Sequence, residues 1–138
     1  MRSTTRKFAT LGGAVALAAS GLVGVASPAS AATSCYATSC NGLDPSTTIC
    51  QNDARTVSTG STGIELRYSP TCRAAWARKQ NNGSHTSYIT VVNTNYDQYL
   101  ATVSPWGGGW TRMVNDAGIT ARAAETQDGG DASMTGWY

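Results

Sequence analysis

Residues 32–138 are predicted to form one all-β domain, a small antiparallel barrel or sandwich of six to seven short strands. Composition is the first observation, because this region holds sixteen Thr whereas Lys and Glu together occur three times. Its ten aromatic residues are all Trp or Tyr. Thr, Tyr, Trp, Val and Ile favour strands, while Lys, Glu and Leu are the usual helix formers. The second observation is apolar alternation with a period of two, and the third is a turn signal between the alternating runs.

The alternation places the strands along the chain. Residues 64–68 alternate apolar and charged side chains, which is typical of a half-buried strand, and residues 88–92 predict a central strand that is apolar on both faces. The composition of residues 72–79 tolerates a helix of two turns, but the flanking Pro and Asn-Gly residues favour a strand. Asn82-Gly83 is interpreted as a tight turn between residues 74–79 and 87–93. Further short strands are predicted at 100–103, 111–114, 119–125 and 134–138.

The first 31 residues have the order of a secretory signal. Arg2, Arg6 and Lys7 precede an apolar stretch at residues 8–25, and a small-residue Ala-Ser-Ala site follows. Cleavage is expected after Ala31 or one position later. The chain therefore divides into a signal peptide, 1–31, and a single disulfide-containing extracellular domain, 32–138, and the protein is expected to be secreted.

Two alternatives to a cleaved signal are weaker. A transmembrane anchor needs about 20 strongly apolar residues, and the stretch at 8–25 is rich in Gly and Ser. A lipoprotein would carry its lipid on Cys35, which lies far from the apolar stretch and would leave an odd number of cysteines. No stable membrane anchor is therefore expected.

The charge of the mature region excludes some classes of partner. Residues 32–138 hold seven Lys and Arg against eight Asp and Glu. A nearly neutral domain lacks the basic patch that nucleic acid or an anionic membrane attracts. The expected partner is an unknown extracellular ligand or a component of the cell envelope.

Four cysteines lie in the mature region, and an even number in a secreted chain indicates disulfides. Three pairings are possible. We favour Cys35–Cys40, which closes a short N-terminal loop, and Cys50–Cys72, which ties the following loop to the end of the strand at 64–68. No metal site is predicted, because the cysteine spacings are unlike those of zinc ligands and the sequence has a single histidine, His85.

No catalytic residue and no cofactor are predicted. The sequence has none of the common spacings for a serine hydrolase, a zinc protease or a nucleotide-binding loop. A small secreted hydrolase remains an alternative, with His85 as a base beside Ser84 or Ser87. A protease inhibitor is another, presenting the Cys35–Cys40 loop or residues 41–49 as a rigid binding loop.

Several residues resemble those of the YjfA-type family, a secreted bacterial domain of unknown function. The resemblance begins with the first two cysteines and the Gly and Asp-Pro that follow them. It is strongest over residues 65–78, Glu-Leu-Arg-Tyr-Ser-x-x-Cys-x-Ala-Ala-Trp-Ala-Arg, and continues to Thr111-x-Met113-Val114. Some relatives carry this module behind a regulator and a membrane span. The resemblance therefore implies a binding or sensing part, but it supplies no catalytic residue.

Four residues are the candidate binding site. Trp76 and Arg78 lie in the stretch that the resemblance covers, and an Arg beside a Trp offers a cation–π contact. Trp106 and Trp110 flank Gly107–Gly109, where an exposed aromatic loop could meet a ligand, although both indoles could instead complete a core short of aliphatic residues. The sequence thus predicts a non-enzymatic binding module for a cell-wall glycan, a peptide or a protein.

Overall fold

The computed structural model describes residues 30–138, so most of the predicted signal peptide lies outside the described residues. The helical elements of this part are three 3-10 turns, η1 (Ala37–Cys40), η2 (Pro45–Thr47) and η3 (Ile49–Asn52). The strands are β1 (Arg55–Thr59), β2 (Glu65–Ser69), β3 (Ala74–Lys79), β4 (Ser87–Asn93), β5 (Gln98–Val103), β6 (Gly109–Trp110), β7 (Val114–Asn115), β8 (Ala121–Gln127) and β9 (Ala132–Met134). The predicted all-β class is confirmed. No helix in this part of the chain is long and apolar enough to span a membrane.

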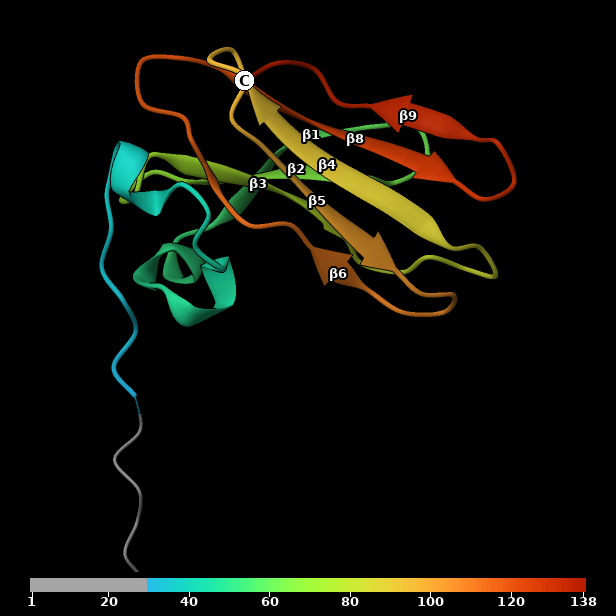
Figure 1. The fold of residues 1–138 in the computed structure, drawn as a ribbon, viewed down its shortest axis with the longest axis horizontal. Helices are drawn as coiled ribbons and strands as arrows, with labels where there is room; N and C mark the ends of the chain where they lie inside the picture. Colours follow the sequence, from blue (N-terminus) through green and yellow to red (C-terminus); the bar gives the residue numbers. More distant parts are fainter. Residues whose placement is uncertain (1–29) are drawn as a thin grey trace, which may run out of the picture.

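The strands form two antiparallel sheets that face each other as a sandwich. One sheet has the order β1-β2-β3-β6, with β7 also paired to β3, and the other has the order β5-β4-β8-β9. Figure 1 shows β4, β5 and β8 in front of β1, β2 and β3, with the η turns gathered at one end. More strands occur than the sequence predicts because β1 is not among the predicted strands and because β6 and β7 have only two residues each.

The inward faces of the sheets share one small apolar core. Leu66 on β2 and Ile89 and Val91 on β4 are fully buried. Both β3 and β8 contribute only alanines to this core. The other core residues are Ile64, Ala75, Ala77, Val103, Val114, Ala121 and Ala123. Because the apolar core is small, covalent and polar interactions have a large share in holding the domain together.

Strand β1 is not predicted by the sequence. Its five residues include a single aliphatic side chain, Val57, and its register against β2 shifts between Thr56 and Ser58. An irregular pairing of this kind breaks the period-two pattern. The strand predicted at 134–138 also differs, since β9 ends at Met134.

The predicted strand at 111–114 is wrong for residues 111–113, which separate β6 from β7; only Val114 is in a strand, and both strands pair with β3. Between them, the Thr111 hydroxyl accepts a hydrogen bond from the Ala77 N–H at 3.1 Å, and the Thr111 N–H donates to the Ala77 carbonyl at 3.0 Å. A side-chain hydroxyl therefore replaces one backbone partner and interrupts the strand.

The segment at 72–79 is a strand as predicted, and the helical alternative is wrong. The interpretation of Asn82-Gly83 as a hairpin turn is also wrong, because β3 and β4 belong to different sheets. The Asn82 side chain is buried and donates to the Val103 carbonyl at 2.9 Å. The Asn82 side chain therefore binds the segment that connects the two sheets, residues 80–86, to the end of β5, and it does not cap a tight turn.

The two predicted disulfides are confirmed. Cys35 bonds to Cys40 and Cys50 bonds to Cys72. Together with η1, η2 and η3 they form an N-terminal lobe, residues 33–54, that packs on the outer face of β3. The buried residues at this contact are Cys40, Cys50, Cys72, Ala74, Trp76 and Met113. The lobe thus packs over Ala74 and Trp76 on the outer face of β3.

Candidate functional site

A surface groove of about 250 Å³ lies where the N-terminal lobe meets the outer face of the first sheet. The lobe contributes one wall, and β2, β3 and β6 contribute the floor and the opposite wall. The lining residues are Pro45, Ser46, Gln51, Ala54, Arg67, Trp76, Arg78 and Trp110. Three of the four predicted binding residues, Trp76, Arg78 and Trp110, therefore lie together in it.

Strand register explains why these side chains meet. Arg67 on β2 lies opposite Trp76 on β3, and Arg78 lies between Glu65 on β2 and Trp110 on β6. Alternate residues of a strand share a face, so Trp76 and Arg78 point outward while Ala75 and Ala77 enter the core. Arg67 and Arg78 therefore lie on neighbouring strands and share the outer face of the sheet.

The two indoles have different roles in the groove. Trp76 is 4% exposed and packs against the lobe, so it forms the floor. Trp110 is 45% exposed, and its Nε1–H donates to Asp44 Oδ1 at 2.9 Å. Partial burial alone would raise the pKa of Asp44, but hydrogen bonds from Trp110 and Ser46 outweigh it and lower that pKa. The ionised carboxylate holds an exposed aromatic face at the rim.

Glu65 fixes the position of Arg78. The Arg78 Nε donates to Glu65 Oε2 at 2.6 Å, and Gln80 donates to Glu65 Oε1 at 2.9 Å. Burial would raise the pKa of Glu65, but these hydrogen bonds and the Arg78 charge lower it below its usual value. Glu65 therefore stays ionised and both of its oxygens are occupied.

Trp106 lies outside the groove lining. It is 76% exposed in the β5–β6 connection, which Figure 1 shows at the end of the sandwich away from the η turns. Neither Trp106 nor Trp110 folds back into the core. A Cβ on Gly108 would lie 2.6 Å from the Gln80 carbonyl oxygen, so this glycine is needed for close packing of the connection against the end of β3. The glycines therefore do not by themselves indicate a ligand.

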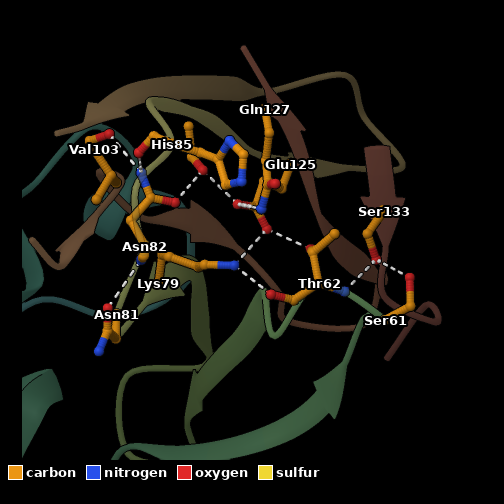
Figure 2. Close-up of polar contacts among 12 residues, drawn as sticks. Ser61, Thr62, Lys79, Asn81, Asn82, His85, Val103, Glu125, Gln127 and Ser133 are labelled. Atoms are coloured by element: carbon orange, nitrogen blue, oxygen red, sulfur yellow. Dashed lines mark hydrogen bonds and ion pairs between the residues drawn. The ribbon is translucent and has the colours of Figure 1, made fainter. Parts of the chain in front are cut away.

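A second cluster of polar side chains closes the end of the core that lies away from the N-terminal lobe (Figure 2). Lys79 Nζ lies 3.0 Å from Glu125 Oε2 and also donates to the Thr62 carbonyl. The Glu125 carboxylate further accepts hydrogen bonds from the hydroxyls of Ser87, at 2.5 Å, and Thr62. The side chains of Lys79 and Glu125 are 4% and 0% exposed. This buried polar cluster is inaccessible to a substrate, and its role is to close the end of the core.

This buried polar cluster is not predicted from the sequence, although the strand periodicity contains a signal for it. Lys79 is in phase with Ala75 and Ala77, and Glu125 is in phase with Ala121 and Ala123. Burial would raise the pKa of Glu125, but hydrogen bonds from Ser87, Thr62, Lys79 and Gln127 lower it. The carboxylate is therefore ionised and paired inside the protein.

A family described as a protein of unknown function, DUF2690, matches residues 38–124. The chain belongs to the DUF2690 family. No curated protein and no solved structure matches the chain significantly. Every residue that lines the groove falls within the matched span, and the likeness to the YjfA type stays an expectation.

The hydrolase alternative requires a histidine base beside a hydroxyl nucleophile, and this DUF2690 domain shows only part of that arrangement. His85 Nδ1 lies 3.3 Å from Asp128 Oδ1, and both side chains are about half exposed. The Ser87 hydroxyl is bonded to Asn82 and Glu125 instead, and Ser87 is fully buried. The described contacts therefore give His85 an acidic partner but no hydroxyl nucleophile.

The four cysteine sulfurs form the cluster of potential metal ligands in the described part of the domain. All four lie within 4.8 Å of one another. In two disulfides, however, they have no thiolate to offer a metal. The cluster is the covalent centre of the N-terminal lobe, which supplies one wall of the groove.

Asp116 is a buried carboxylate outside the groove. It is 5% exposed, and neither of its side-chain oxygens has a hydrogen-bond partner within the described part of the domain. Burial raises the pKa of Asp116 to about 7, although the charge of Arg73 opposes this. In the folded protein, Asp116 therefore holds its proton at pH values where the unfolded chain has lost it.

Asp116→Asn should remove a pH-dependent loss of stability. A carboxyl whose pKa is raised on folding stabilises the fold at acid pH, and this contribution is lost as the pH rises toward 7. At pH 8 the free energy of unfolding of the variant should be about 1–3 kcal/mol higher than that of the parent. At pH 4 the two proteins should have the same free energy of unfolding. Denaturant titrations at both pH values measure this, with the exposed Asp131→Asn as the control. An equal effect of Asp116→Asn at both pH values would contradict the assignment.

Proposed function

We propose that this DUF2690 domain is a non-enzymatic binding module that works outside the cell, and that the groove holds its ligand. The expected ligand class is a component of the cell envelope. The proposal assigns the indole of Trp110 and the guanidinium of Arg78 to ligand contact, and it assigns Trp76 to the floor.

One observation carries the proposal. Trp110 keeps a large apolar surface exposed at the rim of a concave site, although its N–H is bonded to Asp44. An indole fixed in this way loses little conformational entropy when a ligand packs on it, and exposed aromatic residues in concave sites are typical of binding. The groove also collects residues that come from three strands and from the lobe.

The two disulfides support a place outside the cell. Disulfides form and persist in oxidising compartments, whereas the cytosol keeps thiols reduced. Both bridges lie in or next to the lobe that forms a groove wall, so the proposed site depends on an oxidising environment. This is consistent with the signal sequence expected at residues 1–31.

Trp110→Ala should abolish retention on the ligand with little loss of stability. The test uses the exported protein with its disulfides formed, mixed with insoluble cell wall and centrifuged. Trp137→Ala is the matched control, because Trp137 is exposed to a similar extent, 48%, but lies outside the groove, where it stacks on Arg122. We expect the parent and Trp137→Ala to sediment with the wall and Trp110→Ala to stay in solution.

Three other results of this sedimentation assay have defined meanings. Equal retention of Trp110→Ala and the parent contradicts the groove as the binding site. Loss of retention in Trp106→Ala places the β5–β6 connection in the binding surface, which the sequence predicts. Breakdown of the wall by the parent, abolished by His85→Ala, favours the hydrolase alternative.

A further inference from the structure

The residues that line the groove carry two positive charges, although the domain is nearly neutral and the carboxylates of Asp44 and Glu65 bond to lining residues from outside the lining. The groove lining includes two arginines and no Asp or Glu, whereas residues 32–138 hold more acidic than basic residues. Positive charge inside a concave site raises the local concentration of anions. The charge balance of the lining therefore favours a ligand with a negative group.

Arg78 presents the donors for such a group. Its Nε is used by Glu65, its side chain is 29% exposed, and its two terminal nitrogens have no hydrogen-bond partner in the described part of the chain. Two parallel N–H groups of a guanidinium match the two oxygens of a carboxylate. Glu65, which is also bonded to Gln80, orients these two N–H groups and offsets part of the Arg78 charge, but it leaves both terminal nitrogens available to a ligand.

Arg67 adds a second positive charge beneath the groove. Its terminal nitrogens donate to Thr56 Oγ1 at 2.9 Å and to the Ala54 carbonyl at 2.8 Å, while its buried Nε has no partner. Burial lowers the pKa of Arg67, and repulsion from Arg78 lowers it further. An anion bound near both arginines would reduce this repulsion.

The floor favours a ring-shaped ligand over an extended peptide. A peptide commonly adds a strand to a free sheet edge, but the groove lies over β2 and β3, which are paired on both sides. Ala77 on β3 lies opposite the gap between β6 and β7, and its backbone N–H and carbonyl are both hydrogen-bonded to Thr111. Recognition must therefore come from side chains. The groove, about 250 Å³, is smaller than the roughly 300–1,000 Å³ of sites for drug-sized molecules, so it suits a single ring.

We infer that the groove binds a saccharide that carries a carboxylate. The sugar ring packs on the exposed face of Trp110, and the carboxylate pairs with the terminal nitrogens of Arg78. Arg67 contributes to the field without direct contact. This inference rests on the proposed function and specifies the ligand class of the same groove.

Two matched pairs of sugars test the inference by NMR titration of the exported, oxidised protein. Glucuronate is compared with glucose, and N-acetylmuramate, which adds a lactyl group, with N-acetylglucosamine, so each acid carries a carboxylate that its neutral partner lacks. Acetate tests the carboxylate without a ring, and trialanine tests a peptide carboxylate. We expect each sugar acid to bind at least about tenfold more tightly than its neutral partner, acetate and trialanine to bind more weakly than both acids, and added salt to reduce the preference.

Variants of Arg78 distinguish the effect of its paired N–H donors from the effect of its positive charge alone. Arg78→Gln should remove most of the preference for the acid, and Arg78→Lys should retain only part of it, because lysine keeps the charge but loses the paired N–H donors. Arg122→Gln is the control, since Arg122 stacks on Trp137 outside the groove. It should retain the full preference. Melting temperatures of all three variants verify that they are folded.

The remaining outcomes distinguish this inference from the proposed function. If acids and neutral sugars bind equally and Trp110→Ala abolishes both, the groove is a binding site but the carboxylate inference is wrong. If trialanine binds more tightly than every sugar, the ligand class is wrong. If no probe binds and the protein does not sediment with cell wall, the inference and the proposed function both fail.

Discussion

Replacing Lys79 with Met should lower the free energy of unfolding by about 3–5 kcal/mol, one of the two largest losses that we expect. The change leaves the Glu125 carboxylate buried without its cation, and ionic groups in such a position are strongly destabilising. Denaturant unfolding at neutral pH measures the loss. It should shrink at acid pH, because Glu125 can then take up a proton.

A second variant separates charge from shape at this position. In Lys79→Met combined with Glu125→Gln, no unpaired charge remains. The amide oxygen can still accept from the Ser87 hydroxyl, and the amide N–H can donate to the Thr62 hydroxyl oxygen. The double variant should recover about 1–3 kcal/mol relative to Lys79→Met. If the double variant is less stable than Lys79→Met, the ion pair is not the reason for the loss.

Replacing both Cys50 and Cys72 with Ser should lower the free energy of unfolding by about 3 kcal/mol. This disulfide joins residues 22 positions apart and ties η3 to the turn before β3, so its loss also increases the freedom of the unfolded chain. The matched control removes Cys35 and Cys40, which are 5 positions apart, and should cost about 2 kcal/mol. Denaturant unfolding of the two double variants gives the comparison.

The Cys50–Cys72 variant should also weaken ligand binding. Pro45, Ser46 and Gln51 form the lobe wall of the groove and precede or follow Cys50 closely in sequence. Without the bridge this wall is held to the sheet by fewer contacts. A variant that is destabilised but keeps full retention on cell wall would show that the lobe wall does not contribute to the site.

The sequence predicts those parts of the fold in which alternation is regular. Strand β2 alternates apolar and charged residues, and β4 is apolar on both faces, so both strands are predicted. The favoured disulfide pairing, one of three possible, is also the one observed. Strand β1 is missed because residues 55–59 are mostly Ser and Thr and their register shifts. The two-residue strands β6 and β7 are too short to have a pattern, and they depend on β3 as a template.

The candidate site is predictable to a similar degree. Trp76 and Arg78 share a face because they are two positions apart on one strand. The position of Trp110 opposite Arg78 depends on β6, and the pairing of Trp110 with Asp44 joins residues 66 positions apart. Neither contact follows from local sequence. Trp106, which the sequence analysis groups with Trp110, lies outside the groove because it is part of the turn at residues 105–106 that precedes β6.

The central claim is that the groove beside Trp110 holds the ligand, and indole NMR tests it most directly. The chain has four tryptophans, so the exported protein should give four indole N–H signals that single Trp→Phe variants assign. On titration with solubilised cell-wall fragments, the Trp110 signal should shift, because a ligand on this indole changes its surroundings and its bond to Asp44, while the Trp137 signal stays in place. A shift of Trp137 with an unchanged Trp110, or no shift in a protein that sediments with cell wall, would contradict the account.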